Sequence, residues 1–261
     1  MMIVRKIQKA LAVAVLACIP VLMLPYLCLY GTVYRETTPK HGSRIAVFLV
    51  QTDNQTRTVK GKRVLRQVPV MLGDIVLVNK DHPLPADYEV ELLTLPDRVN
   101  QADRKAYDSL VAMLRDGQKQ GLQFEICSSY RSVRRQMELF DEDVYTLMLE
   151  GYTYEEAYKE VEKETMPPGC SEHSTGLAFD IVALDYQLLD QWQEMTPENI
   201  WLQENCARFG FILRYPRGKE EITRISYESW HFRYVGVESA TYITEKGITL
   251  EEYFLENGKS L

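Results

Sequence analysis

Two short stretches of the chain carry side chains that could hold a metal and hydrolyse a peptide bond. SEHSTGLAFDI (171–181) contains His173 and Asp180, and ESWHFRYVG (228–236) contains Glu228 and His231. A catalytic zinc needs three protein ligands, an open position for water, and a nearby carboxylate that accepts a proton. Two histidines and an aspartate meet the first need, and Glu228 meets the last. The two stretches therefore predict a zinc hydrolase.

The histidines make this interpretation specific, because the chain has only 4 of them against 37 acidic residues. His41 and His82 lie outside any acid-rich cluster, and we interpret them as surface residues. His173 and His231 each stand inside a dense motif. Since a single histidine is more often structural than a ligand, the metal interpretation depends on the residues that surround these two.

Around these residues the sequence resembles the VanY-type D-alanyl-D-alanine carboxypeptidases, zinc enzymes that trim peptidoglycan stem peptides. The resemblance extends over four blocks, which are LVNKDHPLP (77–85), SSYRSVRRQ (128–136), PPGCSEHSTGLAFDI (167–181) and FILRYPRGKEEITRISYESWHFRYVG (211–236). It implies that His173, Asp180 and His231 bind Zn²⁺ and that Glu228 is the catalytic base. Peptidoglycan stem peptides, or their precursors, are then the expected substrate.

A cation is expected beside the metal to stabilise the oxyanion of the tetrahedral intermediate, and Arg131 is the candidate. A carboxypeptidase must also recognise a free terminal carboxylate, for which arginine, glutamine and serine are suitable donors. The resemblance makes Gln136 and Ser171 substrate contacts alongside Arg131.

The sequence departs from the family pattern at three positions near the site. Arg224 stands where the family often has glycine, Ser229 where proline usually precedes the Trp-His pair, and Cys170 directly before Ser-Glu-His. None of these changes removes a predicted ligand, so we expect them to affect local loop geometry more than chemistry.

Other designs fit the sequence less well. No serine is followed three residues later by lysine, and neither Gly-x-Ser-x-Gly nor His-Glu-x-x-His occurs. A cysteine hydrolase built on Cys127 or Cys170 would leave Asp180 and Glu228 without roles. The net charge of −7 and the absence of a glycine-rich phosphate loop or a basic aromatic stripe argue against nucleotide and nucleic-acid partners.

The N-terminal residues predict a membrane anchor. Residues 10–30 carry no charge over 21 positions, which is long enough to cross a bilayer, and Arg5, Lys6 and Lys9 precede them. The positive-inside rule then places everything after Gly31 on the extracytoplasmic side of the cell membrane. A cleaved signal peptide is the alternative.

We expect three segments: a cytoplasmic tip and transmembrane helix at 1–30, a stem with some β structure at 31–70, and the catalytic domain at 71–261. RIAVFLV (44–50) is predicted to form a strand of the stem. The fold class predicted for the catalytic domain is α+β. By resemblance, a small antiparallel sheet carries the zinc site and helices flank it.

Periodicity and capping residues predict the elements of this domain. Strands are expected at LQFEI, LAFDI and FILRY. Asn100 is expected to cap a helix that continues to about Gln120, and Thr196 to cap one from Pro197 to Arg208. Residues 132–165 should form two helices split at Gly151, the second opened by a capping box of Thr153 and Glu156.

The leading functional prediction is a zinc D,D-carboxypeptidase that removes the terminal D-alanine from pentapeptide stems. An L,D-carboxypeptidase acting on tetrapeptides is a close alternative, and a catalytically silent wall-binding zinc domain, related to hedgehog domains, is a more distant one. Retention of Glu228 and Arg131 argues against a silent domain. A disulfide between Cys127 and Cys170 is conceivable in an oxidising compartment, although two buried free thiols are the favoured interpretation.

Overall fold

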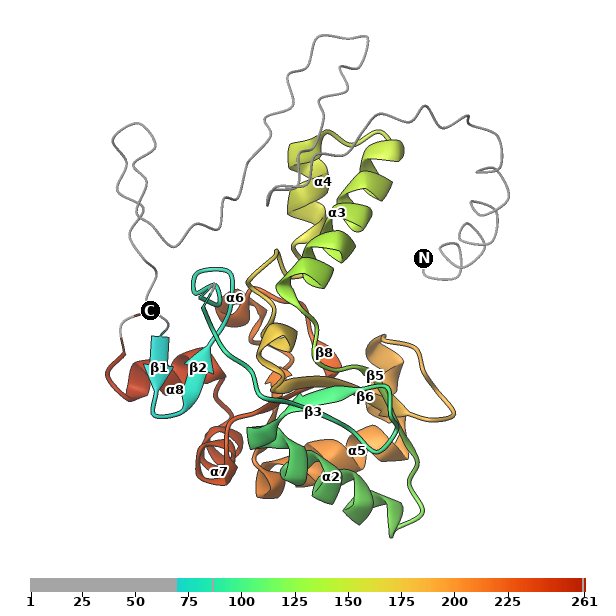
Figure 1. Cartoon of the computed structure of the whole chain (residues 1–261), viewed down its shortest axis with the longest axis vertical. Helices are drawn as coiled ribbons and strands as arrows, with labels where there is room; N and C mark the ends of the chain where they lie inside the picture. The colour runs from blue at the N-terminus through green and yellow to red at the C-terminus, as the bar shows by residue number, and fades with distance from the viewer. Residues whose placement is uncertain (1–69, 86, 260) are drawn as a thin grey trace. The chain divides into compact units, whose positions relative to one another are not determined.

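The computed structural model describes residues 70–85, 87–259 and 261 (Figure 1). The predicted transmembrane segment at 10–30 and the predicted strand at 44–50 lie outside the described residues. Among the described residues, no helix is both long enough and apolar enough to cross a membrane.

An antiparallel sheet of four strands, in the order β5-β6-β8-β7, forms the centre of the fold. Its strands are β5 (Phe124–Ser128), β6 (Ala178–Ala183), β8 (Glu228–Tyr234) and β7 (Phe211–Tyr215). Two further antiparallel pairs are β1 (Val70–Leu72) with β2 (Ile75–Leu77), and β3 (Leu92–Thr94) with β4 (Gln101–Asp103). The predicted small antiparallel sheet and its strands at LQFEI, LAFDI and FILRY are confirmed.

Helices surround this sheet, as the α+β prediction requires. The α-helices are α2 (Arg104–Gln118), α3 (Val133–Leu149), α4 (Tyr154–Val161), α5 (Pro197–Asn205), α6 (Glu220–Thr223), α7 (Val237–Lys246) and α8 (Leu250–Glu256). Short 3₁₀ helices are η1 (Glu172–Thr175), η2 (Gln191–Met195) and η3 (Cys206–Phe209).

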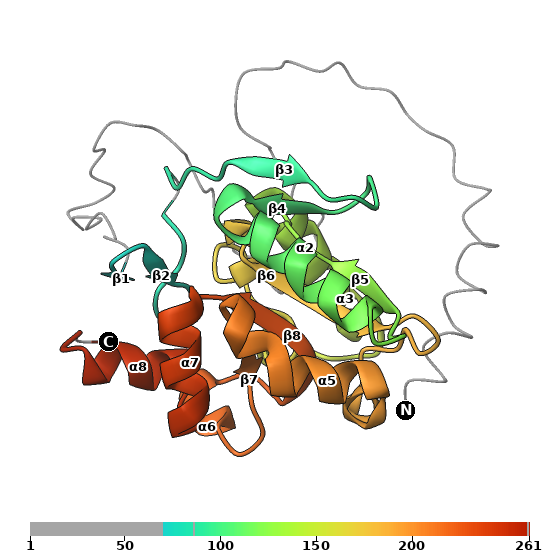
Figure 2. The same ribbon diagram turned by 90° about the horizontal axis from the view of Figure 1, so that it is seen from below.

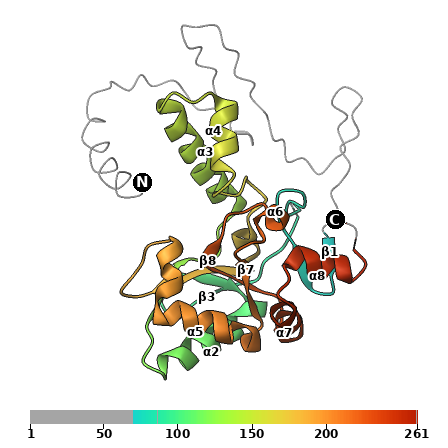
Figure 3. The ribbon, with the colours of Figure 1, turned by 180° about the vertical axis from the view of Figure 1, so that it is seen from behind.

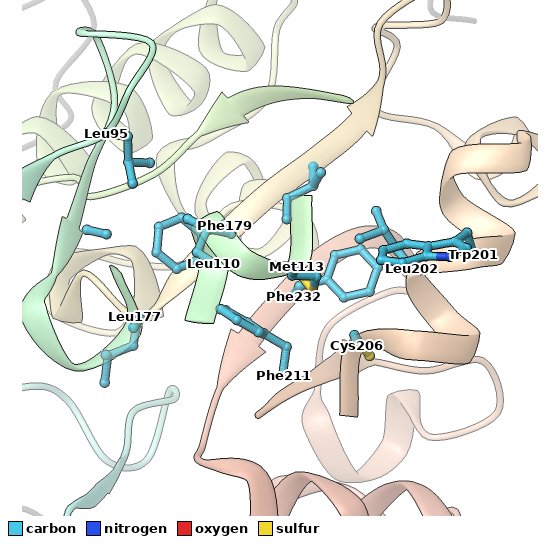
Figure 4. Packing of buried hydrophobic residues seen from close by; sticks show 13 residues of the cluster. Leu95, Leu110, Met113, Leu177, Phe179, Trp201, Leu202, Cys206, Phe211 and Phe232 are labelled. Carbon is cyan, nitrogen blue, oxygen red and sulfur yellow. The ribbon is translucent and has the colours of Figure 1, made fainter. Parts of the chain in front are cut away.

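The main hydrophobic core lies between the sheet and helices α2 and α5, which lie on the same side of it (Figures 2 and 3). Side chains alternate between the two faces of a strand, so Phe179 of β6 and Phe232 of β8 point into this core. They pack with Leu110 and Met113 of α2 (Figure 4). The residues next to these phenylalanines, Asp180 and His231, belong to the opposite face.

Helices α3 and α4 lie side by side, on the other side of the sheet from α2 and α5 (Figures 1 and 3). They share a small core of their own, made by Phe140, Val144, Ala157 and Val161. The predicted split at Gly151 and the capping box of Thr153 and Glu156 are confirmed.

Helices α7 and α8 pack with the β1–β2 pair around a second apolar cluster, which includes Leu77, Ile212 and Phe254. The sequence predicted neither helix. The cluster ties the C-terminal end of the described chain to strand β7 of the central sheet.

Two predicted helix boundaries are wrong. Asp103 caps α2, because its side chain accepts a hydrogen bond from the Lys105 backbone nitrogen at 2.8 Å. Asn100 instead binds the Ile126 carbonyl and the Ser129 hydroxyl, at 3.1 and 2.7 Å. Residues 101–103, expected inside the helix, form β4. Helix α5 keeps its Thr196 cap but gives way to η3 after Asn205.

Candidate active site

The three predicted metal ligands come together on the polar face of the central sheet. His173 lies in η1, Asp180 in β6 and His231 in β8, where Asp180 and His231 are direct cross-strand neighbours. Each residue offers one ligand atom, and these atoms all lie within 4.8 Å of one another. All three side chains are buried. The structure therefore brings the three predicted ligands together, and their role as metal ligands stays a prediction.

Hydrogen bonds orient the first histidine toward this meeting point. His173 Nδ1 lies 2.8 Å from the Ser129 carbonyl oxygen, which can only accept, so Nδ1 carries the proton. His173 Nε2 is then free as a donor atom and lies 3.3 Å from Asp180 Oδ2. His173 faces Asp180 with Nε2, whereas His231 faces it with Nδ1, which lies 3.1 Å from Asp180 Oδ1.

The donor set fits a divalent metal. Asp180 Oδ1 is fully buried and has no hydrogen-bond partner among the described residues, as expected for an atom that a cation would satisfy. Burial raises the pKa of Asp180, but His173 and His231 outweigh it and hold that pKa well below its usual range. Burial also lowers the pKa of His173, which favours the neutral form that binds metal. Two imidazoles and a carboxylate are a ligand set that zinc accepts.

Glu228 begins strand β8 and lies at the edge of this group. Its Oε2 is 3.5 Å from His231 Nδ1, and its side chain is 15% exposed. Burial, helped by the charge of Asp180, raises the pKa of Glu228 to about 8, whereas His231 and Arg131 act in the opposite direction. A carboxylate that titrates near neutrality can both take up and release a proton, as a general base must.

Arg131 follows β5 and is fixed beside the same group. Its guanidinium donates to Gln136 Oε1 at 2.8 Å and to Ser128 Oγ at 2.6 Å. Its backbone nitrogen donates to the His173 carbonyl at 3.1 Å, and its own carbonyl accepts from Ser174 Oγ at 2.8 Å. A guanidinium has five N–H donors, so the Arg131 side chain keeps donors beyond these two bonds.

The other two predicted substrate contacts occupy structural positions. Gln136 is buried, with its oxygen bound to Arg131 and its nitrogen donating to the Met166 carbonyl at 2.6 Å. It thus acts in the structure as a support for Arg131. Ser171 is the buried residue that precedes η1. Direct contact of either residue with substrate stays a prediction.

Sequence reasoning missed two residues that support the site. Ser128 binds the Arg131 guanidinium, and Glu172 has one carboxylate oxygen 3.6 Å from His231 Nε2. Both belong to motifs that the sequence made conspicuous, SSYRS and SEHS, but nothing in the one-dimensional pattern says which way their side chains point.

The three cysteines within the described residues are free thiols. Cys127, Cys170 and Cys206 form no disulfide in the structure, so the bridge considered between Cys127 and Cys170 is not formed. Cys170 packs with Met166, Tyr215 and Ile225, as expected of a buried thiol, but Cys127 is exposed, and the expectation that it is buried is wrong.

The departure at Arg224 has a visible structural consequence. Arg224 ends α6 with a φ of 58°, in the left-handed region that glycine adopts most easily. Its side chain pairs with Asp81, and its carbonyl accepts from Lys80 Nζ at 3.0 Å. These contacts hold an arginine where glycine would carry no conformational cost.

Comparison with known proteins agrees with this geometry. The family model described as VanY: D-alanyl-D-alanine carboxypeptidase matches residues 99–237. A D-alanyl-D-alanine carboxypeptidase of Enterococcus faecalis is 40% identical over 181 residues, which cover 69% of this chain and 65% of that enzyme. The chain therefore spans slightly less than two thirds of that relative's length.

Solved structures give the same result at the level of the fold. A mutant of the vancomycin resistance D,D-pentapeptidase VanY, in complex with Zn(II), is 39% identical, with a TM-score of 0.59 over 69% of this chain and 97% of that one. The LdcB LD-carboxypeptidase is 34% identical, with a TM-score of 0.62 over 71% and 86%. Since the family model also matches more than half of the sequence, the chain belongs to the VanY family of D-alanyl-D-alanine carboxypeptidases.

Proposed function

We propose that this protein is a zinc-dependent D,D-carboxypeptidase that removes the C-terminal D-alanine from peptidoglycan stem pentapeptides. The observation that carries the proposal is the convergence of His173, Asp180 and His231, each with one ligand atom, within 4.8 Å. Glu228 and Arg131 lie next to them. The family match and the zinc in a solved relative support the choice of metal.

In this proposal His173 Nε2, His231 Nδ1 and a carboxylate oxygen of Asp180 hold the zinc. A bound zinc supplies Lewis acidity, which polarises the scissile carbonyl and makes water a better nucleophile. Glu228 takes the proton from the attacking water and returns it to the leaving amine of D-alanine. The water oxygen thus ends in the new carboxyl group of the shortened peptide. The second water proton leaves this group as it ionises to a carboxylate, and the released D-alanine takes up a proton to become an ammonium.

Arg131 completes the proposed site as a fixed positive charge. Because Gln136 and Ser128 hold its guanidinium in place, the charge needs no reorganisation during the reaction. It can stabilise the oxyanion that develops on the scissile carbonyl, or bind the terminal carboxylate of the substrate.

The specificity can be tested with synthetic stem peptides. Zinc-loaded protein is incubated with a pentapeptide ending in D-Ala-D-Ala and, separately, with the tetrapeptide that lacks the last residue, and products are identified by mass spectrometry. We expect loss of one alanine from the pentapeptide and little change in the tetrapeptide. Cleavage of the tetrapeptide alone would indicate an L,D-carboxypeptidase activity, like that for which the structurally similar LdcB LD-carboxypeptidase is named.

We also propose that residues 10–30 anchor the protein in the cell membrane, with residues 71–261 on the extracytoplasmic side. The uncharged run and the basic residues before it support this proposal. In intact cells stripped of their wall, added protease should degrade the catalytic domain. Protection of this domain until the cells are lysed would contradict the proposed orientation.

A further inference from the structure

A second group of charged side chains lies buried behind His231, on the side away from Asp180. It consists of Glu172, Arg214, Arg233 and Glu251 and is called the buried charge cluster here. Glu172 is 1% exposed, both arginines are 0% exposed, and Glu251 is 4% exposed. The two positive and two negative charges balance, as buried ions generally must.

The two oxygens of Glu172 have different surroundings. Oε1 lies 2.8 Å from Arg214 Nε and 2.8 Å from Arg233 Nη1, so both guanidiniums converge on this one atom. Oε2 faces His231 Nε2 at 3.6 Å. Both Oε2 and His231 Nε2 are fully buried, and neither has a hydrogen-bond partner among the described residues. Each of these two atoms is therefore a candidate hydrogen-bond partner for the other.

The rest of the cluster holds this arrangement in place. Glu251 of α8 binds Arg214 through two bonds, from Nη1 at 2.8 Å and from Nη2 at 2.6 Å. Asn79 in turn donates to Glu251 at 3.1 Å. Arg233 also donates to the Val76 carbonyl at 2.8 Å. Because these contacts fix both guanidiniums, and both guanidiniums bind Glu172 Oε1, the Glu172 carboxylate has little freedom to turn Oε2 away from His231.

A neutral imidazole carries its proton on one nitrogen only. A proton on His231 Nε2 would point at Glu172 Oε2 and leave the Nδ1 lone pair directed toward Asp180. The opposite tautomer would set an Nε2 lone pair against carboxylate lone pairs and place a proton where a metal ligand atom is required. The carboxylate of Glu172 therefore favours the tautomer that can bind metal.

We propose that Glu172 is a positioning residue that selects the Nδ1-donating tautomer of His231, with Arg214 and Arg233 fixing the carboxylate that does so. This inference rests on the proposed zinc site but not on the identity of the substrate. It assigns a role to a residue that touches neither the reacting peptide bond nor the metal.

The substitution Glu172→Gln tests the proposal. If the arginines retain its oxygen, the glutamine directs its NH₂ group at His231 Nε2, which favours the wrong tautomer. The matched control is Glu251→Gln, which alters a carboxylate on the same Arg214 but leaves Glu172 and both guanidiniums in place. Full-length protein is titrated with zinc against a chelator of known affinity, and thermal unfolding of the metal-free form is recorded in parallel.

We expect both variants to lower the melting temperature of the metal-free protein, since both remove a buried charge. Only Glu172→Gln should weaken zinc binding, by about tenfold to a hundredfold, as loss of an outer partner of a ligand histidine does. Equal zinc affinity in Glu172→Gln and wild type, or an equal loss in both variants, would overturn the proposal.

A measurement on the unmodified protein keeps the test decisive if Glu172→Gln does not fold. In zinc-loaded wild type with ¹⁵N-labelled histidine, long-range ¹H–¹⁵N correlations report which nitrogen of each ring is protonated. The proposal requires His231 to be protonated on Nε2, and a proton on Nδ1 would overturn it. Wild type that binds zinc with this tautomer but releases no D-alanine would contradict the proposed function and leave this inference standing.

Discussion

The two faces of the central sheet are built from the same strands and have opposite chemistry. Phe179 pairs across the sheet with Phe232, and the next pair along the same two strands is Asp180 with His231. The phenylalanines are 0% exposed and belong to the main core. The Asp180 and His231 side chains are almost as deeply buried, yet each has a polar atom without a hydrogen-bond partner in the described structure.

This contrast shows how the fold separates stability from chemistry. Because successive residues of a strand alternate between faces, a shift of one position moves a substitution from the apolar core to the metal site. On the core face, burial of aromatic surface stabilises the fold. On the other face, the buried Asp180 Oδ1 is costly until a cation satisfies it. Substitutions at neighbouring positions should therefore fail in different ways.

The largest loss of activity is expected from His231→Ala. Two remaining ligands rarely hold a catalytic zinc against solvent, so the purified variant should lack zinc and release no measurable D-alanine. Elemental analysis after gel filtration checks the metal content. A folded variant with a full zinc complement would remove His231 from the ligand set.

Glu228→Ala should separate metal binding from chemistry on the same face. Glu228 is not a proposed ligand, so the variant should keep its zinc, whereas turnover of the pentapeptide should fall by about a hundredfold or more, as loss of a general base does. Steady-state kinetics and metal analysis on one preparation are needed. Near-normal turnover with zinc in place would show that another group accepts the proton.

Arg131→Ala should be nearly as harmful as Glu228→Ala. Loss of an oxyanion contact would appear mainly as a lower kcat, whereas loss of a contact to the substrate carboxylate would appear mainly as a raised KM. Arg135→Ala is the matched control, because Arg135 lies in the same motif but is exposed and pairs only with Glu138 among the described residues. If both variants kept wild-type kinetics, Arg131 would have no role in the reaction.

Phe232→Ala should have the smallest effect on catalysis per folded molecule and a large effect on stability. Removing a fully buried phenylalanine typically costs about 3–5 kcal/mol of unfolding free energy. Urea denaturation measures this loss. The folded fraction should still bind one zinc per chain. If the variant were as stable as wild type but free of zinc, the assignment of the two faces would be reversed.

Much of the site could be predicted from the sequence, because its residues stand in contiguous motifs. His173 and Asp180 share one block, and Glu228 and His231 share another. The β6–β8 register that makes Asp180 and His231 neighbours was not available from these motifs. It depends on non-local pairing between segments about fifty residues apart.

The buried charge cluster was out of reach for a different reason. Arginine and glutamate are normally surface residues, and nothing in the sequence marks Arg214, Arg233 or Glu251 as buried. Helix α8, which carries Glu251, also lies beyond the segment that matches the family model. Local sequence rules also failed at Asn100. Its side chain does not cap a helix, because it hydrogen-bonds to the Ile126 carbonyl and to the Ser129 hydroxyl instead.

The most direct test of the account is the release of D-alanine by full-length protein as a function of its zinc content. The protein is stripped with a chelator, dialysed, and assayed on the pentapeptide before and after addition of one equivalent of zinc, with His231→Ala treated identically. We predict no release by the stripped protein, full recovery in wild type and no recovery in the variant. Undiminished release by the stripped wild-type protein would contradict the central claim that zinc at this site carries out the hydrolysis.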